Sequence, residues 1–291
     1  MQNDERRIAR TFRGQETLEG AGVKLRRVFG NHTVRFMDPF LLLDHFGSAE
    51  PKDYLAGFPW HPHRGIETVT YMLDGRVAHG DSLGNEGVIQ SGDVQWMNSG
   101  SGIIHQEMPQ RKEGMLEGFQ LWINLPASQK MSVPGYHGLR AKEIPTVRLE
   151  NGGTVRVVAG TFDRTAGPIR GISVDPTYLD VTLPADTGFS LPTKPGYAAF
   201  AYSLEGEAQY DSVEEEFQGP ARAVVYGDGS EIAIRANEKG ARFLLVSGRP
   251  LHEPVAWYGP IVMNTKEELV DAASELERGD FIKHRGVIVE E

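Results

Sequence analysis

Short segments rich in valine, isoleucine, threonine, tyrosine and phenylalanine recur along this chain, and turn-forming residues separate them. The 34 glycines and 17 prolines are spread through all 291 residues and are not gathered in one linker. Runs bounded in this way are typical of β-strands. They are GVKLRRVF (22–29), ETVTYML (67–73), DVQWMN (93–98), GFQLWINL (118–125), TVRVVAG (154–160), YLDVTL (178–183), YAAFAYSL (197–204), SEIAIRA (230–236) and ARFLLVSG (241–248).

Several of these segments alternate between apolar and polar residues. In GFQLWINL, Phe119, Leu121 and Ile123 fall on one face of a strand, while Gln120 and Trp122 fall on the other. Such a pattern predicts a strand with one face turned towards a core. A mostly β chain of this kind folds as a sandwich or as barrels.

One late segment, NTKEELVDAASELERG, has the period of a helix instead. It opens with a capping box, Thr265 to Glu268, and Gly279 is a suitable terminator. Leu269 and Ala272 then fall on one side of the helix. The chain is therefore expected to be all-β with a short C-terminal helix.

The length and an internal similarity both indicate two domains. Cores beyond about 250 residues tend to split, and ETVTYMLDGRVAHGD resembles AAFAYSLEGEAQYDS, with Gly75 opposite Gly206. The stretch PASQKMSVPGYHGLRAKEIP (126–145) contains three prolines and no clear period, so we interpret it as the connection. We expect one domain at 1–134 and another at 135–291, the second including the helix.

Composition excludes several classes of protein. The net charge of -10 and the pI near 5.4 argue against direct nucleic-acid binding, which needs clustered basic residues. The polar N-terminus and the short apolar runs predict neither a secretory signal nor a membrane span, so a cytoplasmic protein is expected. There are no cysteines, so a metal site would use His, Asp or Glu.

Two histidine-containing pairs predict such a site. His61 and His63 stand one residue apart in HPHRGIE, and residues i and i+2 of a strand share a face, about 6.5–7 Å apart. A glycine-rich turn in GDVQWMNSGSGIIHQEM delivers His105 and Glu107 with the same spacing. Two such pairs on neighbouring strands would suit a divalent iron, copper, nickel, manganese or zinc ion.

Nearby residues give further expectations. Val69 and Tyr71 share the parity of the histidines and would form an apolar wall if the strand continued unbroken. His79 falls in an expected hairpin, which predicts a turn or surface role. Trp96 and Met97 are expected to fill the barrel.

The same stretches resemble known families. HPHRGIE resembles the first cupin motif, and Gly92 to His105 resembles the second, with Asn98 where a proline is usual. More narrowly, the chain resembles the pirin family in MDPFLLLDHFG (37–47), FPWHPHRGIETVTYMLDG (58–75), GDVQWMNSGSGIIHQE (92–107) and EPVAWYGPIVMNTKEEL (253–269). Asp44 and His45 belong to this signature and are expected to be structural.

The resemblance implies a bicupin, with two cupin-type β-barrels of the double-stranded β-helix or jelly-roll type. It also implies one metal ion in the amino-terminal barrel, held by His61, His63, His105 and Glu107. The general cupin pattern would instead use Glu67 as the carboxylate ligand. We expect Glu107, since it accompanies His105 on one strand face, and Glu67 is then structural.

The second copy lacks the polar cluster, as the family resemblance also implies for its carboxy-terminal barrel. In the register set by Gly75 and Gly206, His61 falls opposite Pro192 and His63 opposite Lys194, and near Gly229 the positions that face His105 and Glu107 are Ile234 and Ala236. Metal chemistry is therefore expected in the first barrel alone.

Some pirin-like proteins are quercetin 2,3-dioxygenases, so the resemblance implies a metal-dependent dioxygenase that opens a flavonol ring with dioxygen and releases carbon monoxide. One divalent ion is expected, Fe(II) before Zn, Ni, Cu or Mn. Three neutral imidazoles and one carboxylate leave such an ion with a net charge of about +1, which favours an anionic oxygen such as that of the flavonol 3-hydroxyl group. Glu107 is the candidate base.

Other pirins imply a different class of function, a non-enzymatic iron-binding, redox-sensing regulator that acts through protein partners. Fold and ligands are common to both readings, so the residues do not separate them. In either case we expect a monomer that binds no membrane. A sugar-processing bicupin is less well supported, because the neighbours of the candidate ligands are mostly apolar.

Overall fold

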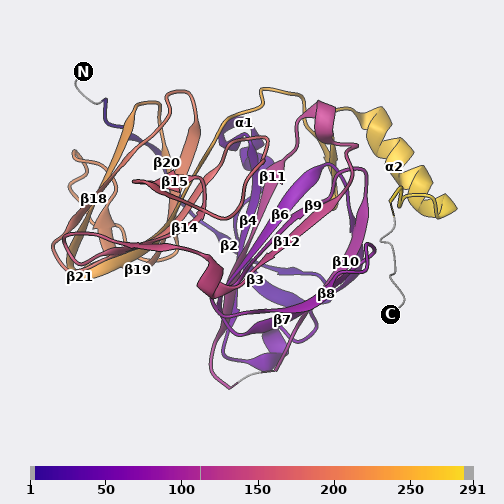
Figure 1. Cartoon of the computed structure of the whole chain (residues 1–291), viewed down its shortest axis with the longest axis horizontal. Helices are drawn as coiled ribbons and strands as arrows, with labels where there is room; N and C mark the ends of the chain where they lie inside the picture. Colours follow the sequence, from indigo (N-terminus) through magenta and orange to yellow (C-terminus); the bar gives the residue numbers. More distant parts are fainter. Residues whose placement is uncertain (1–3, 112, 285–291) are drawn as a thin grey trace. The chain divides into compact units, whose positions relative to one another are not determined.

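The computed structural model describes residues 4–111 and 113–284 (Figure 1). The expected all-β architecture with a short C-terminal helix is confirmed. Contacts between Cα atoms divide the chain into two compact units: unit 1 is Met1–Gly14, Arg35–Pro39 and Lys142–Pro250, and unit 2 is Gln15–Val34, Phe40–Ala141 and Leu251–Glu291. The predicted domain boundary between residues 134 and 135 stays a prediction. The outer ends of the two predicted domains, residues 1–3 and 285–291, lie outside the described part.

Unit 1 contains one eight-stranded antiparallel sheet and a small hairpin. Its order is β1 (Ile8–Arg13), β20 (Arg222–Tyr226), β19 (Ala198–Gln209), β21 (Glu231–Gly248), β17 (Thr177–Leu183), β14 (Thr154–Ala159) and β13 (Thr146–Arg148), with β18 (Gly188–Pro192) paired to β21. The hairpin is β15 (Thr161–Phe162) with β16 (Thr165–Ala166). The segments 230–236 and 241–248, expected as two strands, form one strand, β21, which begins at Glu231 and contains all of both segments except Ser230.

The strands of unit 1 surround an apolar core. Val157, Leu179, Phe189, Ala201 and Phe243, from five different strands, belong to one buried cluster. Because side chains of both halves of the sheet meet there, the sheet curls around its own apolar face. Mostly apolar side chains therefore fill the interior of this unit.

Unit 2 contains two sheets. The seven-stranded sheet has the order β12 (Gly135–Leu139), β9 (Val94–Asn98), β6 (Ile66–Asp74), β11 (Leu116–Asn124), β4 (Phe40–Ser48), β3 (Val23–Phe29) and β2 (Gln15–Glu19). The four-stranded sheet has the order β5 (Phe58–His63), β10 (Ile103–Pro109), β7 (Arg76–Asp81) and β8 (Glu86–Gln90). Leu25, Phe46 and Met72 from the first sheet pack with Val77 and Ile89 from the second.

The stretch predicted as a connection, 126–145, is partly a strand. β12 pairs with β9, with Tyr136 opposite Met97, and is the edge of the seven-stranded sheet. Short 3-10 turns lie on either side of it, Ala127–Gln129 and Ala141–Glu143. The prolines that suggested a connection precede and follow this strand, and edge strands tolerate such neighbours.

The last part of the chain completes unit 2 with the hairpin β22 (Ala256–Tyr258) and β23 (Ile261–Met263), followed by helix α2 (Lys266–Arg278). The predicted capping box is confirmed: Thr265 caps the backbone of Glu268, whose side chain returns to Thr265. Gly279 ends the helix with φ 78°. The apolar face of α2 packs beside Ile104 of β10. The short helix α1 is Val34–Met37, and no helix in the described ranges is long and apolar enough to cross a bilayer.

Candidate metal centre

Three histidines of unit 2 converge on one point. His61 and His63 lie on β5 and His105 lies directly opposite His61 on the paired strand β10. One potential ligand nitrogen from each ring lies within 4.8 Å of those of the other two. The ring centroid of His105 lies 4.3 Å from that of His61 and 5.0 Å from that of His63. The expectation that the two motifs lie on neighbouring strands is confirmed.

Backbone carbonyl groups fix two of the rings. The Nδ1 atom of His61 lies 2.8 Å from the carbonyl oxygen of Pro59, and that of His63 lies 3.1 Å from the carbonyl oxygen of Pro260. A carbonyl oxygen can only accept, so each Nδ1 carries a proton, and in the neutral tautomer each Nε2 then presents a lone pair. The two Nε2 atoms are 3.1 Å apart. Facing lone pairs repel, and a shared cation would remove that repulsion.

His105 supports the same interpretation. Its side chain is fully buried, and neither ring nitrogen has a hydrogen-bond partner among the described residues. Leaving a buried polar atom unpaired usually costs about 1–3 kcal/mol, so an orphaned imidazole calls for a ligand. Burial lowers the pKa of His63 to about 3 and, together with the neighbouring histidines, lowers the pKa of His105 well below its ordinary value. Both rings are neutral at pH 7, the form that binds metals.

Glu107 lies on the same strand as His105 but outside the group of three. Its carboxylate accepts a hydrogen bond from the hydroxyl group of Thr70 at 2.8 Å and another from the side-chain amide of Gln120 at 2.7 Å. It is buried, with 4% exposure. Its role as the fourth ligand therefore stays a prediction.

Glu67, the carboxylate of the general cupin pattern, points elsewhere. It accepts a hydrogen bond from the indole N–H of Trp96 at 3.2 Å, and burial raises its pKa to about 7. Glu67 and Thr70 are three residues apart on β6, so they face opposite sides of the strand, and Thr70 is the one that contacts Glu107.

The prediction from strand parity that Val69 and Tyr71 form an apolar wall at the site was wrong. The chain leaves the four-stranded sheet after His63 and enters the seven-stranded sheet at Ile66, so the alternation does not continue. Gly65 makes this passage with φ 78°, and a Cβ atom there would lie 2.0 Å from the carbonyl oxygen of Val262. The shift in phase turns Thr70, and not Val69 or Tyr71, towards Glu107.

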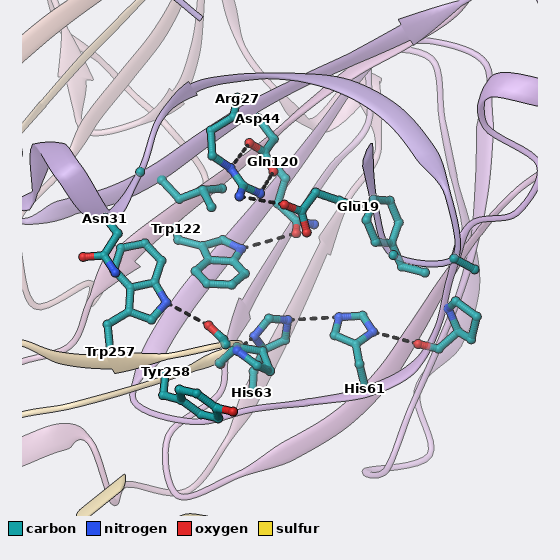
Figure 2. A pocket seen from close by; sticks show the side chains of 18 of the residues that line it. Glu19, Arg27, Asn31, Asp44, His61, His63, Gln120, Trp122, Trp257 and Tyr258 are labelled. Carbon is teal, nitrogen blue, oxygen red and sulfur yellow. Dashed lines mark hydrogen bonds and ion pairs between the residues drawn. The ribbon is translucent and has the colours of Figure 1, made fainter. Parts of the chain in front are cut away.

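A pocket of about 790 Å³ opens beside the histidines (Figure 2). His61, His63 and the rings of Trp122, Trp257 and Tyr258 line one part of it. Trp122 lies edge-on to His63, with 5.0 Å between ring centroids, and 5.8 Å from Trp257. Across the pocket from the histidines lie Glu19, Arg27, Asp44 and Gln120, while Asn31 lies beside Trp257. The cavity is thus aromatic beside the histidines and polar opposite them.

Other predicted residues have mixed outcomes. Trp96 and Met97 are buried, as expected. His79 is not at a turn: it is buried on β7, stacks on Tyr136 and contacts Asp81. The remaining histidines at 32, 137, 252 and 284 lie away from the cluster, and the first three of them are exposed.

Several pocket residues were missed by sequence reasoning. Asp44 lies on strand β4 and lines the pocket, whereas a purely structural role was expected. Trp257, Tyr258 and Pro260 reach the site from a hairpin nearly 200 positions after His63. Their segment carried the family resemblance, which was the only available signal, because no local period encodes so distant a contact.

The sequence matches two families of known proteins, Pirin over residues 22–123 and the Pirin C-terminal cupin domain over residues 178–282. A pirin-like protein of Caulobacter vibrioides is 46% identical over 279 residues, which cover 95% of this chain and 99% of that protein. A Pseudomonas aeruginosa protein provisionally named quercetin 2,3-dioxygenase is 42% identical, covering 91% of this chain and 94% of that one.

Solved structures agree with these matches. A quercetin 2,3-dioxygenase from Acinetobacter baumannii has a TM-score of 0.88 at 32% identity, covering 95% of this chain and 98% of that chain. The bacterial pirin YhhW from Escherichia coli, solved in complex with nickel(II), has a TM-score of 0.65 at 21% identity, covering 83% and 99%. At 21% identity, the similarity to YhhW shows a shared fold only.

Proposed function

Because the chain belongs to the pirin family and has its bicupin fold, we propose that it is a metal-dependent dioxygenase that opens the ring of a flavonol such as quercetin and releases carbon monoxide. The observation that carries the proposal is the convergence of three histidines, two of which, His61 and His63, line the aromatic side of a large pocket. Relatives and structural neighbours with the same activity in their names support it.

The donor set fits a divalent ion. His61, His63 and His105 would hold it, with Glu107 as the fourth ligand, and Fe(II) is the first candidate before Zn, Ni, Cu or Mn. The orphaned nitrogens of His105 are the structural reason for this assignment. When bound, the ion would lower the pKa of a coordinated hydroxyl group and allow redox chemistry with dioxygen.

The pocket suits a flat aromatic substrate. Ligand pockets typically have volumes of about 300–1,000 Å³, and this pocket of about 790 Å³ lies within that range. Trp122 and Trp257 offer apolar ring faces beside His63, against which a flavonol can stack. Such rings also exclude water from the side of the pocket where the reacting hydroxyl group would lie.

The remaining chemistry falls to Glu107. In our proposal its carboxylate takes the proton of the flavonol 3-hydroxyl group. The donors on Thr70 and Gln120 hold both carboxylate oxygens at 2.7–2.8 Å, so the acceptor is oriented before substrate arrives. Each oxygen keeps a further lone pair for this task.

A direct test uses purified protein loaded with Fe(II) and mixed with quercetin in air. We expect loss of the flavonol absorption band and release of carbon monoxide, and we expect neither from the variant His105→Leu. His137→Leu is the matched control, since His137 is an exposed histidine on β12 of the same unit. Absence of turnover with any of the five divalent ions, in protein that binds them, would instead favour the redox-sensing regulator that acts through a protein partner.

A further inference from the structure

The polar side of the pocket is built around one arginine. Arg27 on β3 donates from Nε and Nη2 to the two oxygens of Asp44 on β4, at 2.9 and 2.8 Å, and from Nη1 to Glu19 on β2, at 2.7 Å. We call Glu19, Arg27 and Asp44 the polar wall. Figure 2 shows the polar wall across the pocket from His61 and His63.

The charges of the polar wall determine what it can bind. One guanidinium between two carboxylates gives a net charge of -1, so an anionic group would meet more negative than positive charge. An arginine in a pocket often marks an anion site, but here both carboxylates already occupy it. The polar wall therefore disfavours carboxylates, sulfonates and phosphates.

Hydrogen-bonding capacity remains for neutral groups. Guanidinium has five N–H donors, and the contacts with Asp44 and Glu19 use three of them. A carboxylate oxygen can accept two hydrogen bonds, and the Glu19 side chain is 37% exposed, so it is accessible from the pocket. A hydroxyl group both donates and accepts, so it matches a wall that presents a carboxylate and a guanidinium side by side.

We infer, on the premise of the proposed function, that Glu19 and Arg27 select flavonols whose rings carry neutral hydroxyl groups beyond the 3-hydroxyl and reject flavonols with anionic substituents. The substrate would lie with its reacting hydroxyl group at the histidines and its other hydroxyl groups at the polar wall. Glu19 is then a specificity-determining residue.

The test measures binding without turnover. Protein loaded with Zn(II), in the absence of dioxygen, is titrated with quercetin, with 3-hydroxyflavone, which lacks the other hydroxyl groups, and with a sulfonated quercetin. Quenching of tryptophan fluorescence reports binding, since Trp122 and Trp257 line the pocket. A hydrogen bond to a charged group corresponds to roughly tenfold or more in affinity, so the wild type should prefer quercetin over 3-hydroxyflavone by about that factor.

The variant Glu19→Gln keeps the shape and the contact with Arg27 but removes the charge. It should lower the preference for quercetin several-fold and bind sulfonated quercetin several-fold more tightly than the wild type. Glu16→Gln is the matched control, because Glu16 lies on the same strand, pairs with Lys24 and Arg26, and is outside the pocket lining. It should leave all three affinities unchanged. Equal preferences in the wild type and in Glu19→Gln would overturn the inference.

A parallel assay of the iron-loaded wild type with quercetin in air separates this inference from the proposed function. Selective binding that depends on Glu19, without turnover, would support the polar wall and contradict the dioxygenase. Turnover of quercetin, together with a binding preference that is the same in the wild type and in Glu19→Gln, would support the dioxygenase and contradict the role of the polar wall. Failure of all three flavonols to bind would overturn both.

Discussion

His105 places two polar ring nitrogens in the protein interior, where unpaired polar atoms reduce stability. Its ring is fully buried, and its two nitrogens have no hydrogen-bond partner within the described ranges. Proteins retain such groups at functional sites, where local stability is given up for chemistry. The same residue therefore supports both a prediction about stability and one about metal binding.

The variant His105→Leu should raise the free energy of unfolding of the metal-free protein by about 1 kcal/mol, because it removes two unpaired polar atoms from a fully buried position. It should also abolish metal binding. Urea unfolding in the presence of a chelator and metal analysis check the two parts. A loss of stability by more than about 2 kcal/mol would mean that His105 is held by packing that leucine cannot replace.

Substitution of the two buried carboxylates, Glu107 and Glu67, should have different effects on metal affinity. Glu107→Gln should weaken metal binding by about tenfold or more, the range seen when a ligand or its immediate support is altered. Glu67→Gln should leave it unchanged, since Glu67 bonds to Trp96. Metal titrations of both variants decide between the two, and an opposite result would restore the general cupin assignment.

Glu67 also makes a prediction about pH. Burial raises its pKa from 4.5 to about 7, so between these values the folded state holds a proton that the unfolded state has released, and stability falls as the pH rises. Glu67→Gln lacks this penalty. It should be more stable than the wild type above pH 7, by at most about 3 kcal/mol, and equally stable at pH 4. Urea unfolding at both pH values checks this, and a difference independent of pH would contradict it.

At the scale of the element, alternation along single strands was a sound guide. Phe119, Leu121 and Ile123 are buried on one face of β11, and Gln120 and Trp122 lie on the other, as the pattern predicted; that this second face lines the pocket was not predicted. The capping box of α2 was equally reliable, because it depends on contacts within four residues. Local patterns could predict these features because their causes are local.

Alternation failed where the chain changes sheets. Nothing in the period of HPHRGIETVTY marks the passage between β5 and β6, and only the glycine at position 65 hints at it. For the same reason, the sequence did not predict that His79 is buried: its segment has the pattern of a hairpin, in which a turn or surface position is expected. Both errors arise because burial depends on which strands become neighbours, and strand neighbours are set by the whole fold.

The passage at Gly65 can be tested directly. Gly65→Ala should destabilise the protein by at least about 2 kcal/mol more than Gly84→Ala, because the added methyl group meets the backbone of Val262. It should also weaken metal binding, since relief of this clash would move His63, which lies two residues before Gly65. Gly84 has a similar φ of 87° but open space around it, so its substitution carries only the backbone strain of about 1–2 kcal/mol. Equal effects of the two substitutions would contradict the steric account.

At the scale of the whole molecule, the two units differ in what they bury. Unit 1 encloses apolar side chains such as Phe189 and Phe243, and the only metal-ligand group found among the described residues lies in unit 2. The sequence predicted this asymmetry, because the second copy has Ile234 and Ala236 where the first has His105 and Glu107.

The asymmetry predicts one bound ion per chain. Metal analysis of the loaded wild-type protein after removal of free ion should give one equivalent, and His105→Leu should give none. Two equivalents in the wild type, or one retained in the variant, would place a second site outside the three histidines.

The carbonyl oxygen of Pro260 holds the ring of His63, although the two residues are separated by 197 positions. During synthesis on the ribosome, β5 and β10 are made long before the hairpin that supplies this oxygen. A nascent chain can thus pair those strands early, yet the carbonyl oxygen that orients the His63 ring becomes available only after residue 260 has emerged. A chain cut short before that hairpin would therefore lack the hydrogen bond that orients the His63 ring.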